Sequence, residues 1–320
     1  MKVCVLGATG FIGGHITRAV IAKGWQVCAV RRNPQNVGAI GDVPVEWFTG
    51  NLNDVDSLRR AMRGCDVVFH AAATYLGNFR DIEREVSLAR TEMENVLQAC
   101  SASRVQRLIY TSSITTIGQP PPGRVADERD AYRAGQVKSA YFEAKHVMER
   151  LALRQHGDPD IVVMIPSAVF GPGDIKPTTG VVIREAMHGR IPIYFDATIN
   201  SVDVRDIAQS HVNAVERGKE GERYILGGAS LTIFDLLSKT CQLAGVKPPW
   251  LKVPRPLLTA LVRVCDALPF ITLPENFRTF AQWQAVSSSK AQADLGHAAR
   301  PIEETLRDTI AWFREHPQKK

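Results

Sequence analysis

Two patterns of apolar residues alternate along the first half of the chain. Short runs rich in β-branched residues, which predict buried strands, are separated by longer stretches with the spacing of amphipathic helices. Continuous apolar strands joined by helices predict a parallel sheet covered on both faces. The predicted strands are Lys2–Leu6, Gln26–Val30, Val45–Phe48, Asp66–His70, Arg107–Thr111 and Ile161–Ile165, and the predicted helices are Phe11–Lys23, Asp54–Met62, Arg80–Ser101 and Lys138–Gln155.

The pattern becomes irregular after about residue 170, where Gly171–Pro177 is rich in glycine and proline. We therefore expect a doubly wound α/β core over residues 1–170. A mixed segment, 171–320, is expected to complete this core and to form a smaller, mostly helical lobe, mainly from 174–200 and 230–285. Its predicted helices are Gly180–His188, Arg205–Arg217, Ile233–Ala244, Leu257–Ala267, Glu275–Ala285 and Ile302–Phe313.

Composition excludes several classes of protein. The chain has 320 residues, 45% of them hydrophobic, and a net charge of +6 that is spread without a run of five or more Lys/Arg. A nucleic-acid partner is therefore not expected. The most apolar later stretch, Pro256–Leu273, contains Arg263, Asp266 and Pro269, so no membrane span is expected.

The six cysteines point to a reducing compartment. None forms a CxxC pair, and several lie in apolar runs such as KVCVL and QVCAV. Buried free thiols are the interpretation, which fits a cytoplasmic protein. Because no close Cys/His pairs have ligand spacing, no metal site is expected.

Three glycines directly follow the first predicted strand. Gly7, Gly10 and Gly13 lie in the sequence VLGATGFIGG with GxxGxxG spacing, and a helix pattern begins there. Such glycines permit a tight turn, a close approach of the backbone to a pyrophosphate, and close helix–strand packing. The N–H groups at the helix N-terminus then face the phosphates. A dinucleotide-binding loop is predicted, and a turn with only a structural role is the alternative.

The second predicted strand ends in Arg31-Arg32-Asn33. Enzymes that prefer NAD usually carry an acid at this strand end, where it binds the ribose diol. No acid is present here, and two guanidinium groups would suit a 2′-phosphate. NADP(H) is therefore the expected cofactor, with solvated loop residues as the alternative.

Tyr141 and Lys145 lie four residues apart in the sequence YFEAK, within a predicted helix. Residues i and i+4 share one helix face, so the two side chains should lie side by side. A free tyrosine titrates near pH ~10, and a nearby ammonium lowers that pKa by stabilising the phenolate. The pair is a candidate proton donor with the cation that tunes it. Because this pattern is common on helix surfaces, its meaning depends on the rest of the chain.

The glycine loop, the Tyr141-x-x-x-Lys145 pair and the segment TSSITTIG (111–118) together resemble the extended short-chain dehydrogenase/reductase family, over nearly the whole chain. The likeness is greatest to its dihydroflavonol-reductase-like and 3-beta-hydroxysteroid-dehydrogenase-like branch, which includes bacterial members labelled hopanoid-associated sugar epimerases. The resemblance implies a Rossmann-type core, a C-terminal substrate lobe, and Ser113, Tyr141 and Lys145 as catalytic residues. The cofactor-binding residues it implies are Gly7, Thr9, Gly10, Phe11, Ile12, Gly13, Asn51, Leu52, Ala71, Ala72, Ala73, Ser112, Tyr141, Lys145, Pro166 and Val169.

Two positions depart from the family pattern. The Asp-Leu that follows the third strand in the family is Asn51-Leu52 here. An amide oxygen can accept from the adenine amino group as the carboxylate does. A helix asparagine that supports the lysine through water is Ser87 here, which weakens the predicted proton relay.

The expected activity is that of an NADP(H)-dependent ketone/alcohol oxidoreductase. Two alternatives remain: a nucleotide-sugar epimerase or dehydratase, and a non-catalytic dinucleotide sensor. An intact Ser113, Tyr141 and Lys145 argues against the sensor. A dehydratase usually adds an acid beside the serine, whereas Ile114, Thr115 and Thr116 follow here.

The lobe favours a largely apolar small-molecule substrate. Sugar-nucleotide members of the family carry an arginine seven residues before the aspartate of their V-x-D segment, and this position is Ile199 here. A buried diphosphate without a paired cation would be costly. Apolar and aromatic side chains are expected around the substrate instead, from among Trp250, Phe270, Phe277, Phe280 and Trp283, although Lys176, Arg184 or Arg278 could still reach a phosphate.

Family members often pair two helices across a two-fold axis as a four-helix bundle. These helices correspond to Arg80–Ser101 and Lys138–Gln155. The resemblance therefore implies a homodimer, with a monomer as the alternative.

Overall fold

The structure is a computed structural model that describes residues 1–73, 81–254, 256–258, 260 and 282–317. Much of the two predicted helices at 257–267 and 275–285 lies outside these residues. So do three of the aromatic side chains expected at the substrate, Phe270, Phe277 and Phe280, and the candidate phosphate ligand Arg278.

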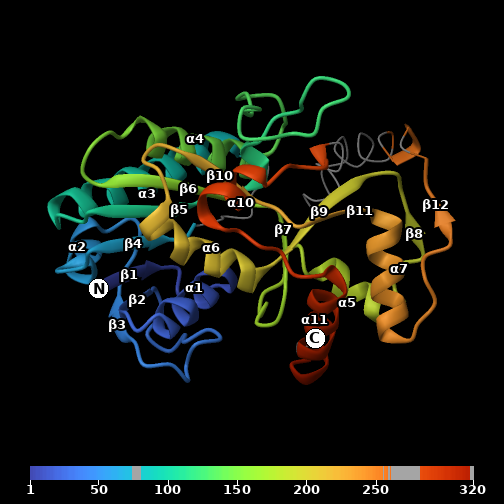
Figure 1. Ribbon diagram of the computed structural model, residues 1–320, viewed down its shortest axis with the longest axis horizontal. Helices are drawn as coiled ribbons and strands as arrows, with labels where there is room; N and C mark the ends of the chain where they lie inside the picture. Colours follow the sequence, from blue (N-terminus) through green and yellow to red (C-terminus); the bar gives the residue numbers. More distant parts are fainter. Residues whose placement is uncertain (74–80, 255, 259, 261–281, 318–320) are drawn as a thin grey trace.

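A seven-stranded parallel sheet forms the core, in the strand order β10-β6-β5-β4-β1-β2-β3 (Figure 1). This confirms the predicted doubly wound fold and its six predicted strands. The seventh strand, β10, was not predicted. The strands are β1 (Lys2–Leu6), β2 (Gln26–Arg31), β3 (Glu46–Thr49), β4 (Val67–His70), β5 (Arg107–Thr111), β6 (Asp160–Pro166) and β10 (Arg223–Leu226).

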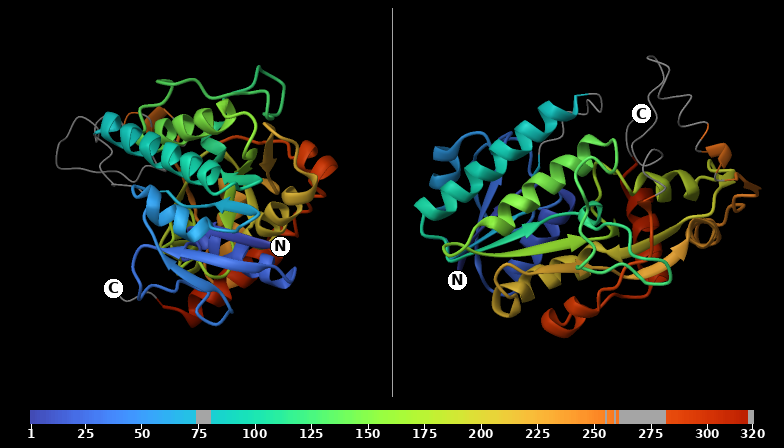
Figure 2. Two further views of the ribbon diagram at one scale, coloured as in Figure 1. Left: turned by 90° about the vertical axis from the view of Figure 1, so that its left-hand side faces the viewer. Right: turned by 90° about the horizontal axis from the view of Figure 1, so that it is seen from above.

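Helices cover both faces of the sheet. Successive side chains of a strand point to opposite faces, so Cys4 and Leu6 belong to one buried cluster while Val3 and Val5 belong to the other. The helices α2 (Val55–Met62), α3 (Ile82–Ala102) and α4 (Ala140–Arg154) pack on the first face, and α3 and α4 lie side by side (Figure 2). The second face is covered by α1 (Phe11–Ala22), α6 (Val204–Arg217) and α10 (Ser289–Leu295).

The start of α4 is set by a side-chain cap. Ser139 accepts a hydrogen bond from the backbone N–H of Phe142 at 3.2 Å, which satisfies a donor that the first helical turn leaves unpaired. The helix therefore begins at Ala140 and places Tyr141 in its first turn and Lys145 one turn later.

The chain after residue 170 builds a lobe beside the sheet and also returns to it through α6, β10 and α10. The lobe has two small sheets, of which one has the order β11-β9-β7 and the other pairs β12 with β8. Sequence reasoning predicted the lobe helices at 180–188, 233–244 and 302–313, which the structure confirms, but not these sheets. Its elements are β7 (Ala168–Phe170), α5 (Val181–Met187), β8 (Ile193–Tyr194), β9 (Thr198–Asp203), β11 (Ala229–Thr232), α7 (Ile233–Ala244), β12 (Leu251–Lys252) and α11 (Ile302–Glu315).

Candidate active site

Most of the predicted site residues lie at one edge of the sheet. The carboxyl ends of parallel strands meet at the same edge, where open α/β sheets bind their ligands. Gly7 follows β1, Ala71 follows β4, Ser112 and Ser113 follow β5, and Ser167 follows β6. The strand register places Leu6 opposite His70, which brings the glycine loop and the Ala71–Ala73 segment together.

The glycine loop is packed too tightly for side chains. Gly7 has φ +87° and lies against the Ala71–Ala72 backbone, where an added Cβ would come within 2.9 Å of Ala71. A Cβ on Gly13 would lie 2.1 Å from the carbonyl oxygen of Gly7. α1 begins after Gly10 with no side-chain cap and no acid in its first turn. Its N-terminal N–H groups therefore suit the phosphates of a dinucleotide.

The other residues expected at the cofactor flank this loop. Leu52 is buried, whereas Asn51 is exposed and its amide oxygen accepts from the backbone N–H of Asn53 at 3.1 Å. Asn51 lies two residues after the end of β3, and its side-chain oxygen closes a turn with Asn53. Half-buried or buried residues complete the set, namely Thr9, Phe11, Ile12, Ala71, Ala72, Ala73, Pro166 and Val169.

The two arginines after the second strand differ in their surroundings. Arg31 ends β2, and its guanidinium lies 4.5 Å from the centroid of the Trp47 ring on neighbouring β3. Arg32 is exposed. No acid stands at this strand end, as the sequence indicates. Arg31 is thus held in place by stacking, while Arg32 is exposed to solvent.

The candidate catalytic residues contact the segment at the end of β5. The Tyr141 hydroxyl donates to Ser113 Oγ at 3.1 Å. Ser113 is buried and also accepts from the Thr115 backbone N–H at 3.3 Å. Lys145 Nζ donates to the Thr111 carbonyl oxygen at 3.2 Å. A serine, a tyrosine and a lysine from β5's end and one face of α4 therefore form one constellation.

The surroundings of Lys145 lower the pKa of its ammonium group. Burial lowers the pKa of Lys145 to about 8, against the charges of Glu149 and Glu92, which raise it. Its ammonium lies 5.7 Å from the centroid of the Tyr110 ring. His70 also packs against that ring, at 5.4 Å between ring centroids. Burial and Lys145 lower the pKa of His70 to about 3, so this imidazole is neutral at pH 7.

Ser87 stands where the family pattern has an asparagine that supports the lysine, and this departure is expected to weaken the proton relay. Ser87 lies on the exposed face of α3, away from the lysine. The buried acid that α3 contributes near Lys145 is Glu92. Ser87 therefore does not itself support the lysine, and the weakening of the proton relay stays a prediction.

Sequence reasoning missed a buried polar cluster behind the catalytic serine. Glu149, one turn after Lys145, accepts hydrogen bonds from the side chains of Ser112 and Thr116. It also pairs with Arg223 of β10 at 2.9 Å. The YFEAK helix carries the acid at a recognisable i+4 position, but nothing local in the sequence connects it with Arg223.

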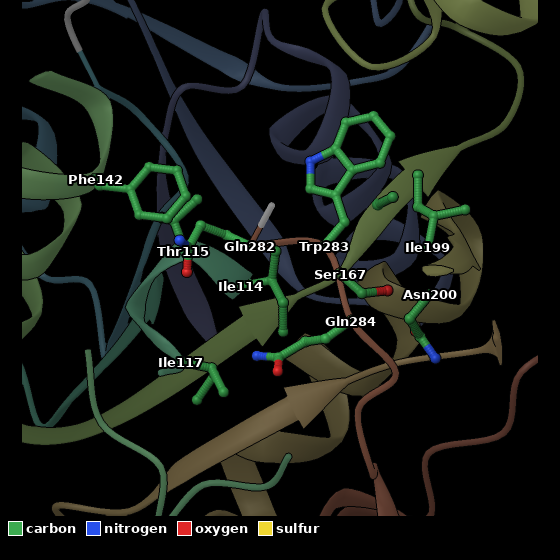
Figure 3. Close-up of a pocket in the computed structure, with 11 residues that line it drawn as sticks. Ile114, Thr115, Ile117, Phe142, Ser167, Ile199, Asn200, Gln282, Trp283 and Gln284 are labelled. Carbon is green, nitrogen blue, oxygen red and sulfur yellow. The ribbon is translucent and has the colours of Figure 1, made fainter. Parts of the chain in front are cut away.

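A pocket lies beside the Ser113–Tyr141 pair, lined by the residues that follow each of them. It holds about 430 Å³ of space, part of it open to solvent. In Figure 3, Phe142 and Thr115 lie on one side, Ile199 and Asn200 on the other, and Trp283 and Ser167 between them. Among the described residues, none of those lining the pocket is charged. The lining is Ile114, Thr115, Ile117, Phe142, Ser167, Ala168, Ile199, Asn200, Gln282, Trp283 and Gln284.

Only some of the lobe residues that were expected to contact the substrate line this pocket. Ile199 and Trp283 line the pocket, as the interpretation of an apolar site requires. Trp250 is 76% exposed and does not line it. Of the candidate phosphate ligands, Arg184 pairs with Glu185 at 3.0 Å and Lys176 is exposed.

Comparison with known proteins identifies the family. The model of the NAD dependent epimerase/dehydratase family matches residues 3–227. The chain belongs to this family. A putative dihydroflavonol 4-reductase from Synechocystis is 34% identical over 98% of the chain and 94% of its own length. Sterol demethylase protein B from Methylococcus capsulatus is 29% identical over 98% of the chain and 99% of its own length.

Solved structures of the family have the same fold. The crystal structure of gox2253 matches 100% of the chain and 99% of its own, with a TM-score of 0.89 and 34% identity. A structure described as a nucleoside-diphosphate-sugar epimerase from Pseudomonas aeruginosa matches 99% and 98%, with a TM-score of 0.85 and 28% identity. The family is one of NAD-dependent enzymes, which supports a nicotinamide dinucleotide as the cofactor of this member and an enzymatic activity.

Two further expectations concern metals and membranes. No group of three or more His, Cys, Asp or Glu residues that could hold a metal ion lies within the described part of the chain. None of the helices described there is long and apolar enough to cross a bilayer.

Proposed function

We propose that this family member is an NADP(H)-dependent oxidoreductase that interconverts a ketone or aldehyde and an alcohol on a largely apolar small molecule. The uncharged pocket beside Ser113 and Tyr141 is the observation that carries the proposal. A dihydroflavonol-, steroid- or aryl-ketone-like compound fits such walls, whereas a nucleotide diphosphate would lack a paired cation there. The similarity to a putative dihydroflavonol reductase supports the same reaction class.

The chain's own residues supply proton transfer and orientation. Bound NADPH supplies a hydride from its nicotinamide ring. Ser113 Oγ donates to the substrate carbonyl oxygen and fixes its orientation. The Tyr141 hydroxyl lies 3.1 Å from Ser113 Oγ, so both groups can contact the same substrate oxygen. Tyr141 gives its proton to that oxygen as the carbonyl is reduced and takes it back in the reverse reaction. The Lys145 ammonium stabilises the phenolate that remains.

The preference for NADP(H) is proposed from the end of β2. Arg31 and Arg32 present two guanidinium groups where an acid would otherwise bind the ribose diol. The guanidinium of Arg31 lies 4.5 Å from the centroid of the Trp47 ring on the neighbouring strand, and this contact supports a fixed position for it. A 2′-phosphate would complete charge-assisted hydrogen bonds there.

A nucleotide-sugar epimerase is the second candidate. Three side-chain amides, Asn200, Gln282 and Gln284, line the pocket and could bind sugar hydroxyls. The similarity to the Pseudomonas protein described as a sugar epimerase favours this reading as well. Asn200, however, already uses its amide on Gly228 and Ser230 at 2.9 to 3.0 Å. A non-catalytic dinucleotide sensor would not require the Tyr141–Ser113 pair.

One assay separates these candidates. NADPH absorbance is followed against aryl ketones, steroid ketones and flavanonols, and the chain is expected to oxidise NADPH with at least one of them. UDP, UDP-glucose and GDP-mannose are expected neither to inhibit that reaction nor to raise the melting temperature of the NADP-bound protein. Saturable micromolar binding of any of these nucleotides would overturn the reductase proposal in favour of the epimerase.

A further inference from the structure

A buried charge pair lies directly behind the segment that carries the catalytic serine. Glu149 is 5% exposed and sits in α4 one turn after Lys145 and two turns after Tyr141. Its Oε1 lies 2.9 Å from Nη2 of Arg223. Arg223 in turn donates to the carbonyl oxygens of Glu128 at 2.7 Å and Thr116 at 3.0 Å. A buried charge is retained only when such partners surround it.

The other carboxylate oxygen of Glu149 accepts hydrogen bonds from residues on both sides of Ser113, in the segment 112–116. Oε2 accepts from the hydroxyl of Ser112, which precedes Ser113, and from the hydroxyl of Thr116 at 2.6 Å. The Thr116 hydroxyl also lies 2.8 Å from the carbonyl oxygen of Ser113. The short helix η1 (Ile114–Thr116) is thus fixed at its start and its end by one side chain of α4.

This arrangement joins the two halves of the catalytic constellation. Tyr141 and Lys145 belong to α4, whereas Ser113 belongs to the loop after β5. We propose that Glu149, held by Arg223, is a positioning residue that fixes the Ser113 segment against α4 and keeps a negative charge beside Lys145. The role depends on the proposed function, since it serves the proton transfer from Tyr141.

The charge of Glu149 acts on Lys145 from within the same helix. Burial lowers the pKa of Lys145, and Glu149 and Glu92 raise it again. The other titratable groups described near this lysine are Tyr141, one turn earlier in α4, His70 of β4, which is neutral at pH 7, and the Tyr110 ring of β5. Loss of the Glu149 charge should therefore move the deprotonation of Lys145 to lower pH.

Glu149→Gln tests position and charge together. The amide oxygen can still accept from Ser112 and Thr116, but the charge facing Arg223 and Lys145 is gone. We expect kcat for carbonyl reduction to fall about tenfold or more with KM changed less than threefold, and the basic limb of the pH–kcat profile to move to lower pH. Glu143→Gln is the matched control: it removes an acid of the same helix that instead binds Tyr132 and the Gly135 N–H. Its profile should coincide with that of the wild type.

Arg223→Gln separates the two effects. It removes the cation while leaving the Glu149 charge, so kcat should also fall, but the basic limb should not move to lower pH. Equal displacement of the basic limb in both variants, or a Glu149→Gln enzyme with wild-type kcat and pH profile, would overturn the proposal. Melting temperatures and circular dichroism of each variant identify any that fail to fold. If Glu149→Gln does not fold, Glu149→Asp keeps the charge but shortens the reach to Ser112 and Thr116, so it should lower kcat without moving the basic limb, and a wild-type kcat would overturn the proposal.

A readout without substrate distinguishes this proposal from the proposed function. NADPH affinity is measured by fluorescence from pH 6 to pH 10 in wild type and Glu149→Gln, because the Lys145 ammonium is expected to bind the nicotinamide ribose. The pH at which affinity declines should be lower in the variant. If no carbonyl compound is reduced by the wild type yet this displacement is found, the reductase proposal fails while the effect of the Glu149 charge on Lys145 stands. Coincident binding profiles would reject the role of its charge, whatever the substrate.

Discussion

The proposed proton donor is the hydroxyl group of Tyr141. Tyr141→Phe keeps the aromatic packing of α4 but removes the group that donates to Ser113. Turnover should fall by roughly 10² or more, while NADPH affinity stays close to that of the wild type. Stopped-flow hydride transfer and fluorescence titration measure the two quantities.

Tyr132→Phe provides the matched control, since Tyr132 donates to Glu143 rather than to the serine. It should retain most of its turnover. A Tyr141→Phe enzyme that also keeps its turnover would remove this tyrosine as the proton donor.

Two arginines should determine which dinucleotide binds. Changing Arg31 and Arg32 to Ala removes the charge-assisted contacts proposed for the 2′-phosphate, which are worth about 1.5–3 kcal/mol. NADPH affinity should fall about 10- to 100-fold while NADH affinity changes little. Isothermal titration with both dinucleotides measures the ratio, and a wild-type protein that binds them equally well would refute the preference.

Short sequence motifs predicted the site residues that are close together in the sequence, but not those that meet only in the folded chain. The Tyr141–Lys145 pair follows from the helical repeat, and Ser113 from the resemblance to the family. Glu149 and Arg223 lie 74 positions apart and meet only because β10 enters the sheet beside β6. Gln284 likewise reaches the Gly118 carbonyl oxygen from the far end of the chain. No pattern within a single element reports such contacts.

At the scale of elements, the length of a segment decided what could be predicted. The strands of the core have continuous apolar runs that mark them in the sequence. The strands β8 and β12 have two residues each, and β7 has three. Runs this short show no period, and their pairing comes from neighbours that are distant in sequence. The lobe therefore appeared mostly helical in the sequence.

The close contact between α1 and the loop after β1 can be tested by glycine substitutions. Gly13→Ala would place a Cβ 2.1 Å from the Gly7 carbonyl oxygen, so the loop or α1 must shift. We expect NADPH affinity to fall at least tenfold and the melting temperature to drop. Gly14→Ala meets its nearest atom at 3.4 Å, in ordinary contact. It should match or slightly exceed the wild-type stability, since alanine favours a helix interior by up to about 1 kcal/mol over glycine.

Titration calorimetry measures the NADPH affinity of the two glycine variants, and thermal unfolding measures their stability. Equal loss of affinity in both would mean that the helix as a whole, rather than its contact with Gly7, controls cofactor binding.

For the whole molecule, buried histidines predict how stability depends on pH. Burial lowers the pKa of His211 to about 4 and that of His70 to about 3, from a usual value of 6.5. Below about pH 6.5 the unfolded chain binds these protons while the folded chain does not. Stability should therefore fall as the pH drops from 6.5 towards 4, by up to about 1.4 kcal/mol per pH unit for each histidine.

Melting temperatures between pH 7 and pH 4.5 test this dependence. His211 contacts Thr111 Oγ1 at 2.9 Å and the Ile207 carbonyl oxygen at 2.8 Å, and His211→Gln keeps a polar group there. The variant should start less stable and lose less on acidification. Parallel curves for variant and wild type would contradict the assignment.

The homodimer stays a prediction at this scale. The exposed side of α3 carries Glu83, Arg84, Arg90 and Glu94, and among the described residues no large exposed hydrophobic side chain belongs to α3 or α4. A bundle formed by these helices would pair mixed charges rather than cover an apolar face.

The late return of β10 to the sheet affects how the protein is made. β6 ends at Pro166 and its neighbour β10 begins at Arg223, so a ribosome adding roughly 5–20 residues per second needs several seconds to supply the missing edge. During that interval the nascent chain holds the glycine loop and the serine segment but not the arginine that meets Glu149. A chain released before residue 223 would leave a buried carboxylate without its cation. The ion pair behind the serine segment is thus completed only when the sheet's last strand is made, and a premature stop within the first part of the lobe yields a chain that lacks both β10 and Arg223.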